Sequence, residues 1–171
     1  MTESIIRTGK RYLINNLLWD AGFITSFVLI TVYSHLLPIP LYAIEPMRII
    51  LILSLIYTKK ANQYFLASIL PVISFAISGH PPIEKSLIIV CELNINVFLF
   101  YLFEKKYKNV FVNAVLSIFL SKVIYYFIKF AVFSLILNES FSLEGERIFQ
   151  QAAVIIVLSG MGWALDAMRK K

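Results

Sequence analysis

The sequence predicts an all-α polytopic membrane protein: a bundle of six transmembrane helices with the N and C termini in the cytoplasm. Three observations lead to this prediction. The chain has 59% hydrophobic and 15% charged residues, with a mean hydropathy of +0.78, whereas soluble domains are nearer ~45–50% apolar and ~25% charged. Apolar segments recur along the chain, separated by short polar turns. Finally, lysine and arginine gather in every second turn.

The apolar segments form one membrane domain, because no stretch is polar enough for a separate soluble module. The predicted spans are Trp19–Leu37, Pro46–Thr58, Gln63–Ser78, Pro82–Phe103, Asn109–Leu137 and Arg147–Met168. A perpendicular span needs roughly 20 residues, so the second and third segments are short, and the fifth must tilt or protrude. The second segment either extends back through Leu41 or is broken at Glu45 and Pro46.

Residues 1–18 and 169–171 flank the bundle of 19–168 as a basic arm and a basic tail. The arm mixes apolar and basic residues, which fits an amphipathic helix on the cytoplasmic interface. An ordinary basic lead-in to the first span fits it equally well. The run that follows is long and has no small-x-small cleavage site, so it is interpreted as a retained helix rather than a signal peptide.

The charged residues of the turns predict the orientation, because cytoplasmic loops are enriched in Lys and Arg. One set of turns and ends is basic: Arg7, Lys10, Arg11, Lys59, Lys60, Lys105, Lys106, Lys108, Arg169, Lys170 and Lys171. The alternate turns are mainly acidic: Glu45, Arg48, Glu84, Lys85, Glu139, Glu144, Glu146 and Arg147. An odd number of helices would break this alternation. The sequence therefore predicts a multi-pass protein of the bacterial inner membrane, and the net charge of +6 needs no nucleic acid to explain it.

Several function classes are excluded by residue type. The single cysteine, Cys91, permits neither an intrachain disulfide nor a cysteine zinc cluster. The two histidines form no HExxH motif, and the sequence contains no GxSxG or phosphate-binding glycine loop. We therefore expect no enzymatic activity, cofactor or metal.

The candidate binding residues are polar groups inside the predicted spans, because a charge within the bilayer usually faces a partner or a cavity. Glu92 and Asn96 share one face of the fourth span, being four residues apart. The fifth span carries a stripe at helical spacing: Lys122, Tyr125, Tyr126 and Lys129. Glu92 and Lys122 come to similar depth, which predicts an ion pair beside an outward-opening pocket for a small anionic or polar ligand. Two simpler interpretations remain: the pair only locks two helices together, and Lys129 only reaches the interface.

Three further candidates lie near the predicted outer ends: Glu45, Arg48 and His80. Glu45 and Arg48 are one helical turn apart and form a simple pair in the plainer interpretation. His80 lies in a Gly-His-Pro-Pro turn, where a histidine is more often a solvated turn residue than a ligand contact.

The chain resembles the substrate-binding S-components of energy-coupling factor (ECF) vitamin transporters over about residues 41–137. The resemblance lies in Glu45-Pro46-Met47-Arg48, Leu70-Pro71-Val72-Ile73-Ser74, Ser78-Gly79-His80-Pro81, Glu92-Leu93-Asn94-Ile95-Asn96 and Ser121-Lys122-Val123-Ile124-Tyr125-Tyr126. It implies a six-helix bundle that binds a vitamin-sized ligand near the outer face, below a lid formed by the first loop. It also implies a transmembrane coupling subunit and two cytoplasmic ATPase subunits as partners.

In that family the first helix commonly presents a small-x-x-x-small surface to the coupling subunit. The best match here is Ala21 with Thr25, or Gly22 with Ser26, which departs from a strict alanine pair. Small residues permit close helix approach, so these four are the expected docking residues.

Two other classes compete with a solute-binding subunit. A scaffold of the cell-shape machinery resembling MreD is also a small membrane bundle, but it needs only partner surfaces and no polar pocket. A membrane enzyme acting on lipid or prenyl groups needs clustered acids or histidines near the headgroups. The outer turns offer only Glu45, His80 and Glu84 for that chemistry.

Overall fold

The computed structural model describes residues 17–33, 45–79, 81–132, 134 and 145–169, and these are helical apart from the turns between helices. An N-terminal helix, Leu17–Tyr33, comes first. The other helices are α2 (Pro46–Tyr57), α3 (Lys60–Ser78), α4 (Ile83–Glu104), α5 (Val110–Ala131) and α6 (Gly145–Arg169). The helical class predicted from the sequence is confirmed, and no strand occurs in these ranges.

The predicted boundaries agree with the helices to within a few residues where both are described. The helix α3 begins at Lys60 rather than Gln63, since the basic turn is tighter than expected. The predicted arm is corrected at its end, because Leu17 and Leu18 already belong to the N-terminal helix. The rest of the arm, residues 34–37 of the first predicted span and 135–137 of the fifth lie outside the described residues.

Among the described residues, four helices are long and apolar enough to cross a membrane: Lys60–Ser78, Ile83–Glu104, Val110–Ala131 and, within α6, Gln151–Met168. The apolar helices Leu17–Tyr33 and Pro46–Tyr57 are shorter. At 1.5 Å per residue α2 is only about 18 Å long, well short of a hydrocarbon core of about 30 Å. Its ends therefore cannot both lie at the surface of a bilayer that its neighbours cross.

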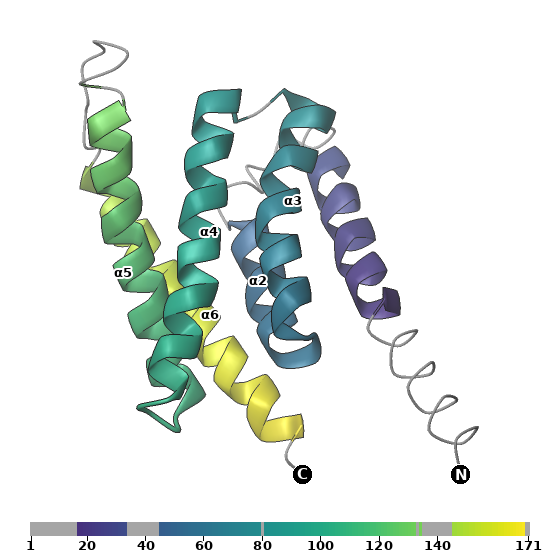
Figure 1. Cartoon of the computed structure of the whole chain (residues 1–171), viewed down its shortest axis with the longest axis vertical. Helices are drawn as coiled ribbons and strands as arrows, with labels where there is room; N and C mark the ends of the chain where they lie inside the picture. The colour runs from purple at the N-terminus through teal and green to yellow at the C-terminus, as the bar shows by residue number, and fades with distance from the viewer. Residues whose placement is uncertain (1–16, 34–44, 80, 133, 135–144, 170–171) are drawn as a thin grey trace.

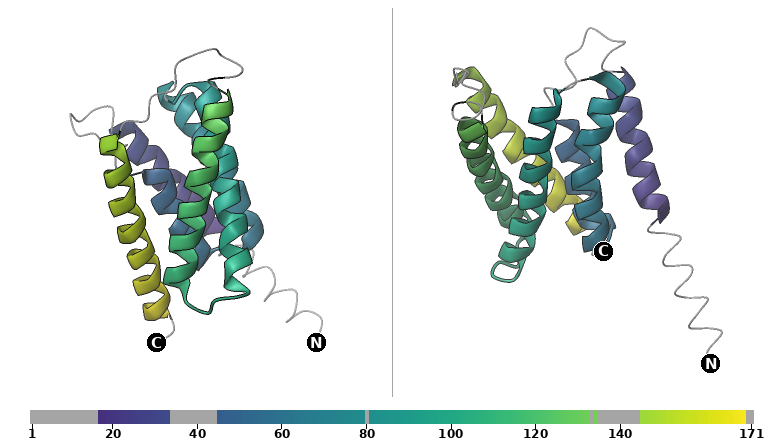
Figure 2. Two further views of the ribbon diagram at one scale, coloured as in Figure 1. Left: turned by 90° about the vertical axis from the view of Figure 1, so that its left-hand side faces the viewer. Right: turned by 45° about the horizontal axis from the view of Figure 1, so that its top comes forward.

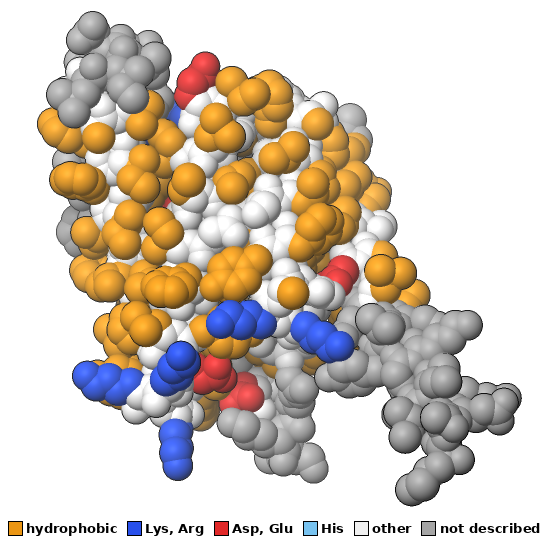
Figure 3. Space-filling model, viewed as in Figure 1, with side chains coloured by type: hydrophobic (Ala, Val, Ile, Leu, Met, Phe, Trp, Pro, Cys, Tyr) orange, Lys and Arg blue, Asp and Glu red, His pale blue; other side chains and the backbone are white. Residues whose placement is uncertain are grey.

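Polarity is distributed as expected for a membrane bundle, with apolar side chains outside and polar ones inside. Phe127 is 74% exposed and Val157 is 68% exposed, whereas Asn96 is 1% exposed and Gln63 is 0% exposed. Figure 3 shows hydrophobic side chains over most of the visible face, with Lys and Arg gathered near its lower end. A surface of this kind favours lipid rather than water as its surroundings.

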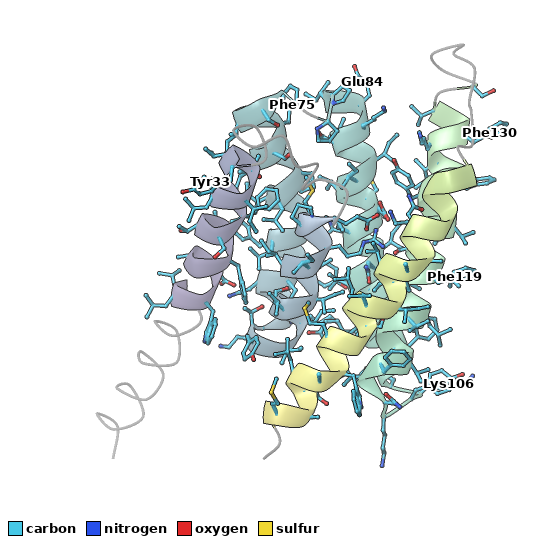
Figure 4. All side chains as sticks on the ribbon, turned by 180° about the vertical axis from the view of Figure 1, so that it is seen from behind. Tyr33, Phe75, Glu84, Lys106, Phe119 and Phe130 are labelled. Carbon is cyan, nitrogen blue, oxygen red and sulfur yellow. The ribbon has the colours of Figure 1, made fainter. Side chains whose placement is uncertain are left out.

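The basic turns lie at one end of the bundle. In Figure 1, the start of the N-terminal helix, the α2–α3 turn, the α4–α5 turn and the end of α6 all lie at the lower end. Figure 4 shows Lys106 at this end and Glu84 at the opposite one. We call the end with Lys106 the lysine-rich end. The first described residue of the N-terminal helix and the last of α6 thus lie at the same end as these lysines.

Three apolar clusters hold the helices together. Phe23 and Phe27 of the N-terminal helix pack against Ile50, Leu66 and Leu70 of α2 and α3. A second cluster joins Leu51, Ala67, Leu93 and Val97 of α2, α3 and α4. The third joins Ile52, Ile118 and Leu158 of α2, α5 and α6. All three include α2, so this short helix lies in the interior, and α6 crosses the bundle behind it (Figures 1 and 2).

Gly162 of α6 lies close to the side chain of Ile52 of α2. A Cβ atom at Gly162 would meet Ile52 Cγ2 at 3.2 Å, whereas a Cβ at Gly160 would meet nothing within 4 Å. We expect Gly162→Leu to lower the stability in detergent by about 1–2 kcal/mol, because overpacking a tight contact forces the helices apart. Gly160→Leu is the matched control and should leave the melting temperature unchanged. Equal melting temperatures for the two variants would contradict the close contact.

Candidate functional site

The site begins at the N-terminus of α2, which lies inside the bundle. Glu45 precedes the helix with φ 52° and ψ 60°, in the left-handed region that few non-glycine residues adopt. Pro46 follows at the first helical position, where its missing N–H costs nothing. The carbonyl of Glu45 accepts from the N–H groups of Arg48 at 2.9 Å and Ile49 at 3.2 Å. This geometry starts the helix abruptly and leaves the Glu45 side chain beside its first turn.

Four charged side chains meet there, and we call them the four-charge cluster: Glu45, Arg48, Glu92 and Lys122. Arg48 Nη2 donates a hydrogen bond to Glu92 Oε1. Arg48 Nε lies 2.9 Å from Glu45 Oε2. Lys122 Nζ donates to Glu45 Oε1 at 2.7 Å and lies 3.7 Å from Glu92 Oε1. Each base therefore faces both acids, and the cluster joins α2, α4 and α5.

The cluster lies near the middle of the long helices. Glu92 is about 18 Å along α4 from Glu104, and Lys122 is about 18 Å along α5 from Val110, both measured from the lysine-rich end. The length of α2 places Glu45 about 18 Å from the α2–α3 turn. All three estimates agree on one depth, about 18 Å from the lysine-rich end. In Figure 4 nitrogen and oxygen atoms gather at this height, where the helices approach one another.

Burial differs among the four side chains. Arg48 is 3% exposed and Glu92 4%, whereas Lys122 is 12% and Glu45 23% exposed. A buried charge without a partner is strongly unfavourable, so the pairing is what permits these groups in the interior. The two acids and two bases cancel in charge. Glu45 is the member that remains most accessible.

Glu92 and Lys122 lie close together, as predicted, but Lys122 is closer to Glu45 than to Glu92. The placement of Glu45 and Arg48 near an outer end was wrong. Because α2 begins deep in the bundle, both residues lie at the depth of Glu92. Of the two interpretations of this segment, the helix that begins after Glu45 is the one observed. Glu45 and Arg48 do pair, as the plainer interpretation held. Arg48 also pairs with Glu92, which the sequence interpretation missed.

Apart from Arg48 Nε, which has only its ion-pair contact with Glu45, two buried nitrogen atoms beside the cluster lack hydrogen-bond acceptors within the described part of the chain: Arg48 Nη1 and Asn96 Nδ2. Asn96 is 1% exposed and lies one turn from Glu92 on the same face of α4. Both atoms are donors. Buried donors are nearly always paired, so this region has spare capacity for an acceptor.

The tyrosines of α5 continue the polar stripe above Lys122. The Tyr125 ring centroid lies 5.6 Å from Lys122 Nζ, and Tyr125 meets Tyr126 edge-on with centroids 5.3 Å apart. Tyr126 donates from its hydroxyl to Gln151 Oε1 of α6 at 2.7 Å. Lys129 lies in the last turn of α5, about 10 Å beyond Lys122. The stripe thus runs from the cluster toward the end opposite the lysine-rich one.

The remaining predicted site residues lie elsewhere. His80 is outside the described residues. Ala21, Gly22, Thr25 and Ser26 are all exposed on the N-terminal helix, and a Cβ at Gly22 would meet open space. Ala21 and Thr25 lie opposite the buried Phe23 and Phe27, and all four residues are exposed, so this surface is available to lipid or to a partner.

Gln63 is a buried polar residue that the sequence interpretation passed over. Its Nε2 donates to the carbonyls of Ser54 and Thr58, each at 3.0 Å, and its Oε1 accepts from the Tyr101 hydroxyl at 2.6 Å. It therefore ties the end of α2 to α4 and holds α2 at its depth. A glutamine just inside an apolar segment was the available signal.

The arrangement offers several charged and polar groups to a ligand. Cations, carboxylates and amide donors at fixed positions can hold a polar solute, and no group of three or more His, Cys, Asp or Glu within the described ranges is placed to hold a metal ion. No family model matches the chain, and neither the curated proteins nor the solved structures contain a match. Functional inference therefore depends on the four-charge cluster and its surroundings.

Proposed function

We propose that this chain is the membrane-embedded substrate-binding subunit of an ECF-type importer. It crosses a bacterial cytoplasmic membrane with six spans, both termini inside, and captures a small vitamin-like solute from the outer face. The observation that carries the proposal is the four-charge cluster, in which side chains from three helices meet at mid-depth. Ionisable residues inside a membrane are costly and commonly mark solute pathways.

The construction of α2 supports a binding role. The short helix α2 begins in the interior of the bundle, with its N-terminus beside the two bases Arg48 and Lys122. Membrane transport proteins commonly build solute sites at interrupted helices, where the N-terminal dipole faces an anionic group. The polar stripe of α5, formed by Lys122, Tyr125, Tyr126 and Lys129, runs from this point toward the outer end. Polar groups therefore line the direction from which a solute would arrive.

The partners in this proposal are a transmembrane coupling subunit and two cytoplasmic ATPase subunits. The chain contains no phosphate-binding glycine loop of its own, so energy from ATP would come from those subunits. The docking surface is the exposed small-residue side of the N-terminal helix, Ala21, Gly22, Thr25 and Ser26. Its small side chains allow a partner helix to approach closely.

One observation favours an alternative, an MreD-like scaffold. The cluster is neutral as it stands, with each acid facing each base, so it can lock α2, α4 and α5 together without any ligand. A scaffold needs no more than that lock and partner surfaces. The two functions differ in whether the purified protein carries a solute.

Retention of a solute is the direct test. The protein is purified from its native membrane in mild detergent, denatured, and analysed by mass spectrometry for a stoichiometric small molecule and for co-purifying proteins. A vitamin-like solute with ATPase subunits supports the importer. An empty protein accompanied by cell-wall proteins contradicts it and supports the scaffold.

Lys122→Met tests the location of the site. Because a hydrogen bond to a charged group contributes about 1.5–3 kcal/mol, we expect solute retention to fall at least about tenfold. Lys105→Met is the control, since Lys105 is exposed beyond the end of α4 and should leave retention unchanged. Equal solute content in the Lys122 variant and the parent protein would refute the site assignment.

A further inference from the structure

The two acids of the cluster are held differently. Glu92 is 4% exposed, whereas Glu45 is 23% exposed and lies on a backbone with φ 52°. A left-handed conformation costs a non-glycine residue roughly 1–2 kcal/mol, and the contacts of Glu45 with Arg48 and Lys122 offset that cost. Because its side chain is the more exposed of the two, Glu45 is the acid whose carboxylate can most readily leave.

Around the two bases, buried hydrogen-bond donors outnumber the acceptors available to them. Arg48 Nη1 and Asn96 Nδ2 are buried donors without acceptors among the described residues. Arg48 itself is 3% exposed and Asn96 1%. The shortage is thus one of acceptor oxygens. A carboxylate offers about four lone-pair sites and no donor of its own, which makes it the complementary group.

The charge balance decides how such a group enters. With Glu45 in place, the two acids and two bases already cancel. A second carboxylate beside them would leave one negative charge uncompensated in the interior, which is strongly unfavourable. A carboxylate that takes the position of Glu45 keeps the balance. Replacement is therefore favoured over addition.

We infer that the solute carries a carboxylate that displaces the Glu45 side chain from Arg48 and Lys122, so that Glu45 is an intrachain stand-in for the ligand. Because the incoming carboxylate is not tethered to the backbone of Glu45, it is free to turn toward Arg48 Nη1 and Asn96 Nδ2, which Glu45 leaves without an acceptor. The displaced Glu45 moves to the more exposed side of the cluster. This inference depends on the proposed solute-binding function for its biological meaning, but the anion site can be tested separately.

Acetate is the probe, because Glu45→Ala removes the four heavy atoms that acetate contains. The variant leaves Arg48 and Lys122 facing Glu92 alone, with one uncompensated positive charge. We expect its melting temperature in detergent to fall below that of the parent protein and to rise by about 2–4 °C in potassium acetate. The parent protein should not respond, because its tethered carboxylate competes at high effective concentration.

Two variants control the experiment. Glu92→Gln also removes one acid, but Glu92 is nearly fully buried, so its melting temperature should not depend on acetate. Glu45→Gln keeps the side-chain shape, and acetate titration of this variant serves if the alanine variant fails to fold. A rise in the Glu45 variants with no rise in the Glu92 variant supports the inference.

Chloride and phosphate at matched ionic strength complete the design. An equal rise with potassium chloride, or a rise with phosphate alone, would overturn the assignment of a carboxylate. No rise with any anion in either Glu45 variant would overturn the site itself. These results are independent of solute retention, so an empty native protein with acetate rescue would contradict the importer and not the anion site.

Discussion

Replacing Arg48 by methionine is expected to destabilise the protein by about 3–5 kcal/mol, the largest single effect at this site. The guanidinium is 3% exposed and faces both carboxylates. Its removal leaves Glu45 and Glu92 with Lys122 as their only base in the cluster. We expect poor yield of folded protein and a strongly lowered melting temperature in detergent.

A second change should reverse this loss. Arg48→Met combined with Glu92→Leu removes one base and one acid and leaves the Glu45–Lys122 pair at 2.7 Å intact. Replacing a buried ion pair by apolar side chains is often neutral or stabilising, so the double variant should regain most of the melting temperature. It should not regain solute. A double variant that retains the solute would show that the cluster is only a lock, and recovery of neither property would contradict the charge argument.

Gln63→Leu is expected to have the second largest effect, about 2–4 kcal/mol. The change removes the donor to the Thr58 carbonyl and the acceptor for the Tyr101 hydroxyl. Each unsatisfied buried group costs about 1–3 kcal/mol. Because Gln63 joins the end of α2 to α4, its loss should also lower solute retention by shifting the far end of α2. Thermal unfolding and ligand content measured on one preparation test both effects.

Tyr101→Phe is the matched control for Gln63. It removes only the hydroxyl that donates to Gln63 at 2.6 Å and leaves both carbonyl contacts of Gln63 in place. The expected loss is about half of that for the leucine variant. Equal losses for the two variants would show that the carbonyl contacts contribute nothing to holding α2.

The helices and half of the cluster could be predicted from hydropathy and periodicity. Glu92 and Asn96 were assigned to one face of α4 because residues four apart always share a helical face. Lys122 was assigned to their depth because a rise of 1.5 Å per residue converts sequence position into height. Both arguments hold because α4 and α5 are long, unbroken helices of 22 residues each.

Glu45 and Arg48 were instead assigned to an outer end of their short segment, although a break at Glu45 and Pro46 was one of its two interpretations. The short α2 begins at Pro46, beside Glu92. Its depth is determined by contacts at its far end, where Gln63 holds the last carbonyls, and by the packing of Ile50, Leu51 and Ile52 on three sides. The packing contacts join residues that are far apart in the sequence, and the Gln63 contacts join α2 to the next helix.

The sequence by itself determined the helical class, the approximate bounds of the helices, and the inward polar face of α4, because these depend on composition and on periodicities within single segments. Only the tertiary structure decided which acid meets which base. Arg48 became the closest partner of Glu92 because a half-length helix is placed by its neighbours. An ion pair between helices depends on their relative height and rotation, and both are set by packing rather than by either segment alone.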